Sequence, residues 1–171
     1  LSGQVHVLGH VPDPRSGAQR TALATDLGQE SFFPTLTVAE HLRMVCFGHG
    51  VVEADERVSD LLEDLELRHL AGHLPEELSS GQRRRLALAS VLARPRRLLI
   101  LDEPVNGLDP VGVVEMRRLM VDLARERGTT ILVSSHNLPE LYQTATDSLI
   151  VDRGRLRRSL SHDELIEHCS R

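Results

Sequence analysis

Seven consecutive residues, Leu98-Leu99-Ile100-Leu101-Asp102-Glu103-Pro104, decide how this chain is expected to fold. The apolar run at 98–101 is typical of a strand that is buried on both faces of a parallel sheet. Asp102 and Glu103 follow directly, so both carboxylates lie at the carboxyl end of the strand, where open α/β sheets place their ligands. There an aspartate can hold Mg²⁺ and a glutamate can orient or deprotonate an attacking water, two tasks that phosphoryl transfer requires. A merely solvated strand end is the alternative.

On both sides of this strand, the sequence alternates between helix and strand patterns. Upstream we expect a strand over Gln4–Leu8, a loop over Gly9–Gly17, and helices over 37–46, 53–70 and 82–93. Downstream we expect a helix that ends at Gly128, a buried strand over 129–134, a short helix over 139–144, two strands around Gly154, and a last helix capped by Ser161. This alternation indicates an α/β fold with a parallel sheet covered by helices, joined to a helical block.

Arginine supplies every basic side chain, because the sequence contains no lysine. The 20 arginines are outnumbered by 25 acidic residues, so the net charge of -5 gives no broad field for nucleic acid. Schiff-base chemistry and a phosphate-loop lysine are excluded for this chain. Arginine clusters occur at 83–85, 94–97 and 153–158, but three phenylalanines and one tyrosine offer few stacking platforms, so surface ion pairs are the favoured interpretation.

Other features set broad limits. Cys46 and Cys169 show no disulfide pattern, which favours reduced, buried thiols. The longest apolar stretch, 86–93, is far shorter than the ~20 residues that a membrane span requires. Residue 1 is Leu and no leader pattern follows it, so we expect further sequence upstream.

A second motif, Leu78-Ser79-Ser80-Gly81-Gln82, directly precedes the helix expected from Gln82. Its serine hydroxyls and backbone N–H groups lie at the positive end of that helix, which is a place that binds phosphate. An ordinary helix cap would explain one serine but not the whole set.

Together these motifs resemble those of the ABC ATPases, in the same order along the chain. Residues 78–82 resemble the signature motif, 98–104 the Walker B strand, 106–109 the D-loop, 134–136 the switch-histidine segment, and 26–30 the Q-loop. The resemblance implies a P-loop NTPase-like ABC ATPase core with a helical subdomain. Residues 1–35 would form the strand and Q-loop region, 36–93 the helical subdomain with the signature motif, and 94–171 the remainder.

The resemblance also implies a role for each site residue. Asp102 would bind Mg²⁺, and Glu103 would act as the base on the attacking water. Gln29 would contact both the metal and that water. His136 would contact the γ-phosphate. The signature residues would contact ATP held by a second ABC ATPase domain; they are Ser79, Ser80, Gly81 and Gln82. Asp109 would lie near the interface with that domain.

Two departures from the family pattern stand out. Ser80 replaces the glycine that is commonest in the middle of the signature motif. More seriously, no G-x-x-x-x-G-K-[ST] phosphate loop is present in the sequence. The chain therefore resembles an ABC domain without its first few dozen residues, and we expect the chain alone not to bind MgATP tightly.

The function implied is that of the ATP-hydrolysing subunit of an ABC transporter, most similar to prokaryotic exporters of drug or antibiotic type. Its partners would be a transmembrane permease and a second ABC ATPase domain, identical or different, at the cytoplasmic face of the membrane, with no nucleic acid. Phe32 and Phe33 would lie where family members contact the permease, and core packing is their alternative role. A soluble ABC ATPase that acts on ribosomes or DNA, and a catalytically silent fragment, remain alternative functions.

Overall fold

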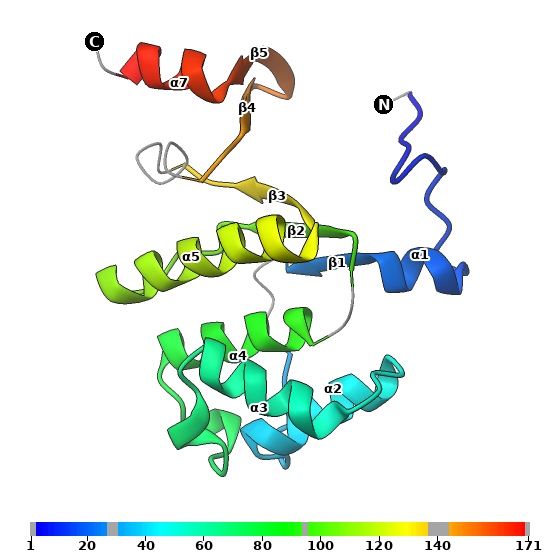
Figure 1. The fold of residues 1–171 in the computed structure, drawn as a ribbon, viewed down its shortest axis with the longest axis vertical. Helices are drawn as coiled ribbons and strands as arrows, with labels where there is room; N and C mark the ends of the chain where they lie inside the picture. The colour runs from blue at the N-terminus through cyan, green and yellow to red at the C-terminus, as the bar shows by residue number, and fades with distance from the viewer. Residues whose placement is uncertain (1–2, 27–30, 94–95, 137–143, 170–171) are drawn as a thin grey trace. The chain divides into compact units, whose positions relative to one another are not determined.

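The computed structural model describes residues 3–26, 31–93, 96–136 and 144–169. The chain divides into two compact units, Leu1–Ser134 and Ser135–Arg171. The first unit contains a parallel sheet and a helical subdomain, and the second contains a hairpin and a helix (Figure 1).

The sheet of the first unit has three parallel strands, in the order β1-β2-β3. They are β1 (Leu23–Asp26), β2 (Leu98–Asp102) and β3 (Thr130–Ser134). The predicted parallel sheet is therefore confirmed. In the register, Leu101 lies between Asp26 and Val133, and Asp102 lies opposite Ser134. The carboxyl ends of all three strands thus meet at one edge.

Burial differs between the two faces of the sheet. Leu99 and Leu101 of β2 are fully buried in the core, whereas Leu98 and Ile100 are only partly covered. Within β3, Leu132 is 52% exposed. The prediction that both faces of both strands are buried is therefore wrong, because the described helices pack chiefly against one face, and an apolar run cannot reveal whether a second layer covers the other.

Three helices form the helical subdomain: α2 (Val38–Gly48), α3 (Ala54–Asp64) and α4 (Ser80–Leu92). The predicted capping box of α2 is present, since Thr37 Oγ1 accepts the Glu40 N–H and the Glu40 carboxylate accepts the Thr37 N–H. Helix α4 packs on β1, α2 and α3 (Figure 1). It therefore joins the subdomain to the sheet.

The helix predicted over 53–70 is shorter in the structure. Helix α3 ends at Asp64, and Glu66 adopts a left-handed backbone with φ 54°, which a continuing helix does not allow. Two single turns of 3-10 helix, η1 (Arg68–Leu70) and η2 (Pro75–Glu77), then lead to α4. Leu67 and Leu70, which lie beyond the end of α3, are also buried. The regular spacing of leucines therefore extends past the helix, and this is why the sequence predicted a longer one.

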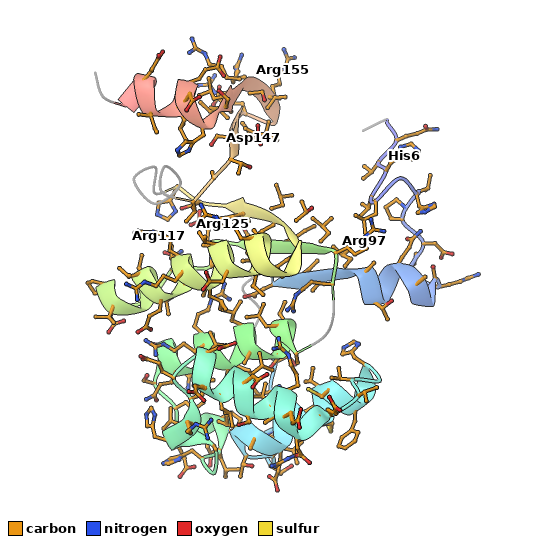
Figure 2. All side chains as sticks on the ribbon, viewed as in Figure 1. His6, Arg97, Arg117, Arg125, Asp147 and Arg155 are labelled. Carbon is orange, nitrogen blue, oxygen red and sulfur yellow. The ribbon has the colours of Figure 1, made fainter. Side chains whose placement is uncertain are left out.

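Helix α5 (Pro110–Arg127) connects β2 to β3. Met116 and Leu123 are buried on its inner face, while Arg117 and Arg125 extend from the helix (Figure 2). Gly128 ends the helix as predicted, with a left-handed φ of 60°.

The N-terminal segment contradicts the prediction of a strand over Gln4–Leu8. Val7 instead pairs with His10 across a tight turn. The alternating pattern has no buried face, since Val5 is 67% exposed, and so hydrophobic burial does not favour a strand there. Helix α1 (Gly17–Ala22), capped by Ser16, and β1 follow, and neither was predicted from these short segments.

The second unit is an antiparallel hairpin of β4 (Asp147–Asp152) and β5 (Arg155–Ser161), followed by α7 (His162–Cys169). Both strands around Gly154 and the cap at Ser161, which accepts the Glu164 N–H, agree with the prediction. The helix predicted over 139–144 lies mostly outside the described residues. Among the described helices, none has the length and apolar character needed to cross a membrane.

Candidate functional site

Asp102 and Glu103 emerge at the carboxyl end of the central strand, as predicted. Asp102 is exposed, and Glu103 leaves the strand with a left-handed φ of 49°. The Ser134 hydroxyl on β3 donates a hydrogen bond to Asp102 Oδ1 and accepts one from the Glu103 N–H at 3.1 Å. The Ser134 carbonyl also accepts the Glu103 N–H at 3.2 Å. A single serine thus holds both acidic residues.

The signature segment forms the start of α4. Ser79 is the N-cap, and its Oγ accepts the Gln82 N–H at 3.3 Å. The Gln82 side chain in turn accepts the Ser79 N–H at 2.8 Å, which completes a capping box. Ser80 and Gly81 occupy the first turn, where backbone N–H groups have no partner within the helix. This geometry suits an anion.

The segment after β2 lies beside the start of α4. A Cβ added at Gly81 would stand 3.8 Å from the Gly107 carbonyl oxygen. Gly107 has a φ of 78°, a conformation that glycine adopts without strain. The signature and D-loop segments of this chain are therefore neighbours.

Asp109 has a structural task in addition to its predicted one. It is the N-cap of α5, where its Oδ1 accepts the Gly112 N–H at 2.9 Å. Arg85 of α4 approaches the same carboxylate, with 4.0 Å between Arg85 Nη2 and Asp109 Oδ1. A Cβ at Gly112 would lie 2.9 Å from Asp109 Oδ1 and 3.2 Å from Arg85 Nη2, so glycine leaves room for both groups.

Arg85 also bridges two glutamates, Glu66 at 2.7 Å and Glu115 of α5 at 3.3 Å. The hydrogen bond from Arg85 lowers the pKa of Glu66, and a bond from Glu115 lowers it further. Partial burial, followed by the bond to Glu66, raises the pKa of Glu115. The pKa values of the two carboxyls are therefore shifted in opposite directions.

The preceding arginine, Arg84, forms a buried ion pair with Asp26 at the end of β1, with 3.0 Å between Nη1 and Oδ1. The sequence did not predict this pair, because the arginines at 83–85 were interpreted as a surface cluster. The helical spacing offered a signal, since Arg84 shares a face with the buried residues Ala87 and Leu88.

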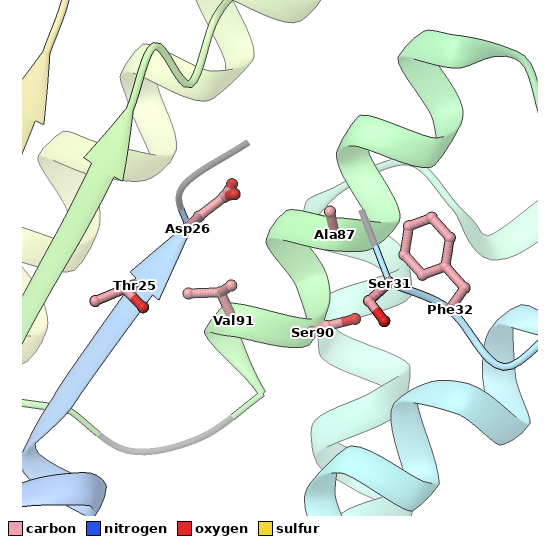
Figure 3. Close-up of a pocket in the computed structure, with 7 residues that line it drawn as sticks. All are labelled: Thr25, Asp26, Ser31, Phe32, Ala87, Ser90 and Val91. Carbon is pink, nitrogen blue, oxygen red and sulfur yellow. The ribbon is translucent and has the colours of Figure 1, made fainter. Parts of the chain in front are cut away.

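A cavity of about 290 Å³ lies beside this pair (Figure 3). It is lined by Thr25 and Asp26 of β1, by Ser90 and neighbouring residues of α4, and by Ser31 and Phe32.

Phe32 and Phe33 differ in their surroundings. Phe32 packs against the core and meets the His41 ring edge-on at a centroid distance of 5.5 Å, while Phe33 is 50% exposed. His41 is buried, and its Nε2 lies 3.0 Å from Ser90 Oγ. Burial lowers the pKa of His41. Core packing thus accounts for Phe32, and Phe33 retains a surface available for contact.

Gln29 and His136 are the remaining predicted site residues. Gln29 lies outside the described residues. His136 follows β3 and belongs to the second unit, where it is exposed. Their functional roles rest on the sequence motifs.

Of the two residues predicted to bind Mg²⁺, Asp102 lies within the described part of the chain. Asp102 presents an exposed carboxylate, and only its Oδ1 takes the Ser134 bond. Within the described ranges, no group of three or more His, Cys, Asp or Glu residues could enclose a metal. Because Mg²⁺ commonly uses one or two carboxylates together with waters and substrate phosphates, a single aspartate fits this ion.

Comparison with known proteins agrees with this geometry. Residues 1–106 match the family model described as "ABC transporter". The chain belongs to the ABC transporter family. This confirms the resemblance seen in the sequence motifs.

Several curated ABC proteins align over nearly the whole chain. The bacitracin transport ATP-binding protein BcrA of Bacillus licheniformis is 34% identical over 164 residues, which cover 96% of this chain and 53% of that protein. The thiamine import ATP-binding protein ThiQ of Rhizobium meliloti (strain 1021) is 35% identical over 170 residues, which cover 95% of this chain and 68% of that protein. The chain spans about half the length of BcrA.

The fold also matches a solved ABC structure. The ATP-binding cassette MJ0796, solved as a dimer in a post-hydrolysis state bound to ADP and Pi, gives a TM-score of 0.82 at 23% sequence identity. The match covers 94% of this chain and 74% of that chain. At this identity the likeness supports the fold, and it confirms the predicted ABC ATPase architecture.

Proposed function

We infer that this chain is part of an ATP-binding and ATP-hydrolysing subunit of an ABC transporter. The observation that carries this proposal is the pairing of Asp102 and Glu103, held by Ser134 at the carboxyl edge of the sheet. Membership of the ABC transporter family and the transport ATP-binding proteins among the relatives support it.

Each carboxylate has a task that suits its position. Asp102 would hold Mg²⁺, which supplies charge stabilisation to the transferred phosphoryl group. Glu103 would accept a proton from the attacking water. Gln29 would orient this water and assist the metal, and His136 would donate a hydrogen bond to the γ-phosphate.

The signature residues would act on a second nucleotide. Ser79, Ser80, Gly81 and Gln82 would contact ATP held by another ABC ATPase domain, with Asp109 close to that interface. The support within this chain is the capped start of α4. Activity would then require a head-to-tail pair of domains.

Coupling to transport would require a membrane partner. We propose that a separate permease binds near Phe33 at the cytoplasmic face of the membrane. The half-exposed aromatic ring at this position supports such a contact. Export of a drug-like or antibiotic substrate is the proposed direction, in keeping with the similarity to the bacitracin transport relative.

ATP turnover by the complete gene product that carries this chain tests the proposal. Glu103→Gln is expected to reduce kcat by about 10²–10⁴-fold, the usual contribution of a general base. The matched control is Glu56→Gln, which alters an exposed carboxylate on α3 and should leave kcat unchanged. Equal turnover by the Glu103→Gln variant would contradict the proposal, and a gene product without turnover would favour the silent alternative.

A second test uses the 171-residue chain itself. Because its sequence contains no phosphate-loop lysine, we expect calorimetry to detect no micromolar binding of MgATP. Micromolar binding would show that other residues of the chain hold the phosphates.

A further inference from the structure

The ion pair between Arg84 and Asp26 is buried at the junction of helix and sheet. The exposed fractions of the two side chains are 9% and 4%, and the distance between Arg84 Nη1 and Asp26 Oδ1 is 3.0 Å. Removing two charges from water is costly, and such a pair often stabilises a fold no better than apolar residues of the same size. Global stability alone is therefore a weak explanation for charges at this point.

The guanidinium of Arg84 reaches a second strand as well. Its Nη2 lies 3.5 Å from the main-chain oxygen of Asp102 and is oriented to donate to it. Arg84 thus contacts the carboxyl ends of β1 and β2 at once. The planar fork of arginine makes such a double contact, which the compact ammonium of lysine cannot reproduce.

The two neighbouring arginines make other hydrogen bonds and ion pairs. Arg83 donates to the Leu78 carbonyl, near the start of its own helix, at 3.3 Å. Arg85 reaches Glu66 and Glu115. Arg84 reaches Asp26 of β1 and the main chain of Asp102 on β2, and so ties α4 to the sheet.

We propose that Arg84 is a positioning residue that fixes the main chain at Asp102 relative to the signature helix α4. The inference rests on the proposed function, in which Asp102 binds the metal and the start of α4 contacts a nucleotide. Through Arg84, a displacement of α4 acts on the ends of β1 and β2 together. The helix that begins with the signature motif is thereby coupled to the carboxylate edge of its own sheet.

A double variant separates this role from stability. Arg84→Met alone leaves the Asp26 carboxylate buried without its cation, and we expect a large fall in melting temperature. Arg84→Met combined with Asp26→Leu replaces both buried charges by apolar side chains. We expect the melting temperature of this double variant to return close to that of the wild type. Amide hydrogen exchange over residues 98–106 should nevertheless remain faster by about tenfold or more, the loss expected for a hydrogen bond from a charged donor.

The matched control is Arg83→Met, which makes the same substitution one residue earlier. We expect it to leave exchange over 98–106 at the wild-type rate. If the double variant does not fold, Arg84→Lys decides the question, because it retains the charge beside Asp26 but loses the fork. It should keep its melting temperature near that of the wild type while exchanging faster over 98–106.

The inference would be overturned if amide hydrogen exchange over residues 98–106 kept its wild-type rate in a folded double variant or in Arg84→Lys. Arg84 would then be a purely structural residue. The exchange measurement uses no nucleotide, so it stands apart from the proposed function. Failure of that function would appear as absence of ATP turnover in the wild-type gene product. If the wild type does turn over ATP, Arg84→Lys should lower kcat, and an unchanged kcat would also count against the inference.

Discussion

The hydroxyl of Ser134 donates to the Asp102 carboxylate from the neighbouring strand and accepts the N–H of Glu103. The parallel register makes this possible, because Asp102 and Ser134 are direct partners on β2 and β3. The hydrogen bonds link the two acidic residues to the sheet at the point where Glu103 takes a left-handed backbone. The turn after β2 therefore depends on a side chain that lies 32 residues later in the chain.

Ser134→Ala should loosen this turn. The variant removes one donor and one acceptor, and since the site is exposed we expect a loss of no more than about 1 kcal/mol in the free energy of unfolding. Ser134→Thr keeps the hydroxyl and suits a strand, so it should retain wild-type stability. Urea denaturation of the three proteins measures the difference, and equal midpoints for Ser134→Ala and Ser134→Thr would contradict the prediction.

The glutamates at Arg85 should respond to substitution in opposite ways. The pKa of Glu66 is lowered from 4.5, so its contribution to stability is present above that pH and is lost as the pH falls through the lowered value. The pKa of Glu115 is raised from 4.5, so its contribution is present below that pH and is lost as the pH rises through the raised value.

At pH 7 we therefore expect Glu66→Gln to be less stable than the wild type and Glu115→Gln to be equally or more stable. Both differences should be below about 1 kcal/mol because the Glu66 side chain is 57% exposed and the Glu115 side chain is 30% exposed, so that solvent screens their charges. Thermal unfolding at pH 4 and pH 7 checks the signs. A loss of stability in Glu115→Gln as large as in Glu66→Gln would be inconsistent with a raised pKa of Glu115.

Much of the site was predictable because local chemistry specifies it. The capping box at Thr37 follows from residue types three positions apart, and the structure contains it. The box of Ser79 with Gln82 has the same spacing, although the sequence predicted only a helix start there. The exit of Asp102 and Glu103 from β2 follows from an apolar run that ends in acids.

Long-range contacts were less accessible from the sequence. The Arg84–Asp26 pair joins residues 58 positions apart, and nothing in the sequence near Asp26 identifies its partner. The end of α3 was missed because Glu66, unlike a glycine, gives no local signal for a left-handed backbone. Tertiary contacts, such as its bond to Arg85, accompany that conformation.

His41 should make the helical subdomain sensitive to acid. Burial lowers its pKa below 6.5 and is the sole cause of the shift, so the folded state resists protonation. The unfolded state then binds the proton more readily, and stability should fall as the pH drops from 6.5 through the lowered value. His41→Gln retains an amide for the Ser90 contact but does not titrate. Its unfolding free energy should vary less than that of the wild type between pH 7 and pH 5, and parallel curves would refute the assignment.

Two glycine substitutions should differ in their effect on the free energy of unfolding. Alanine at Gly112 would place a Cβ 2.9 Å from Asp109 Oδ1, so the cap of α5 must shift, at a cost of about 1 kcal/mol that offsets the gain in helix propensity. Alanine at Gly81 meets its nearest neighbour, the Gly107 oxygen, at 3.8 Å, so the Gly81→Ala variant should have wild-type stability or be up to about 1 kcal/mol more stable.

In the gene product, however, Gly81→Ala should lower ATP turnover, because the added methyl group stands where the proposed phosphate would approach the backbone. Chemical denaturation and turnover assays on the same two variants separate these effects. Equal stabilisation by both substitutions would show that the Asp109 cap accommodates a methyl group.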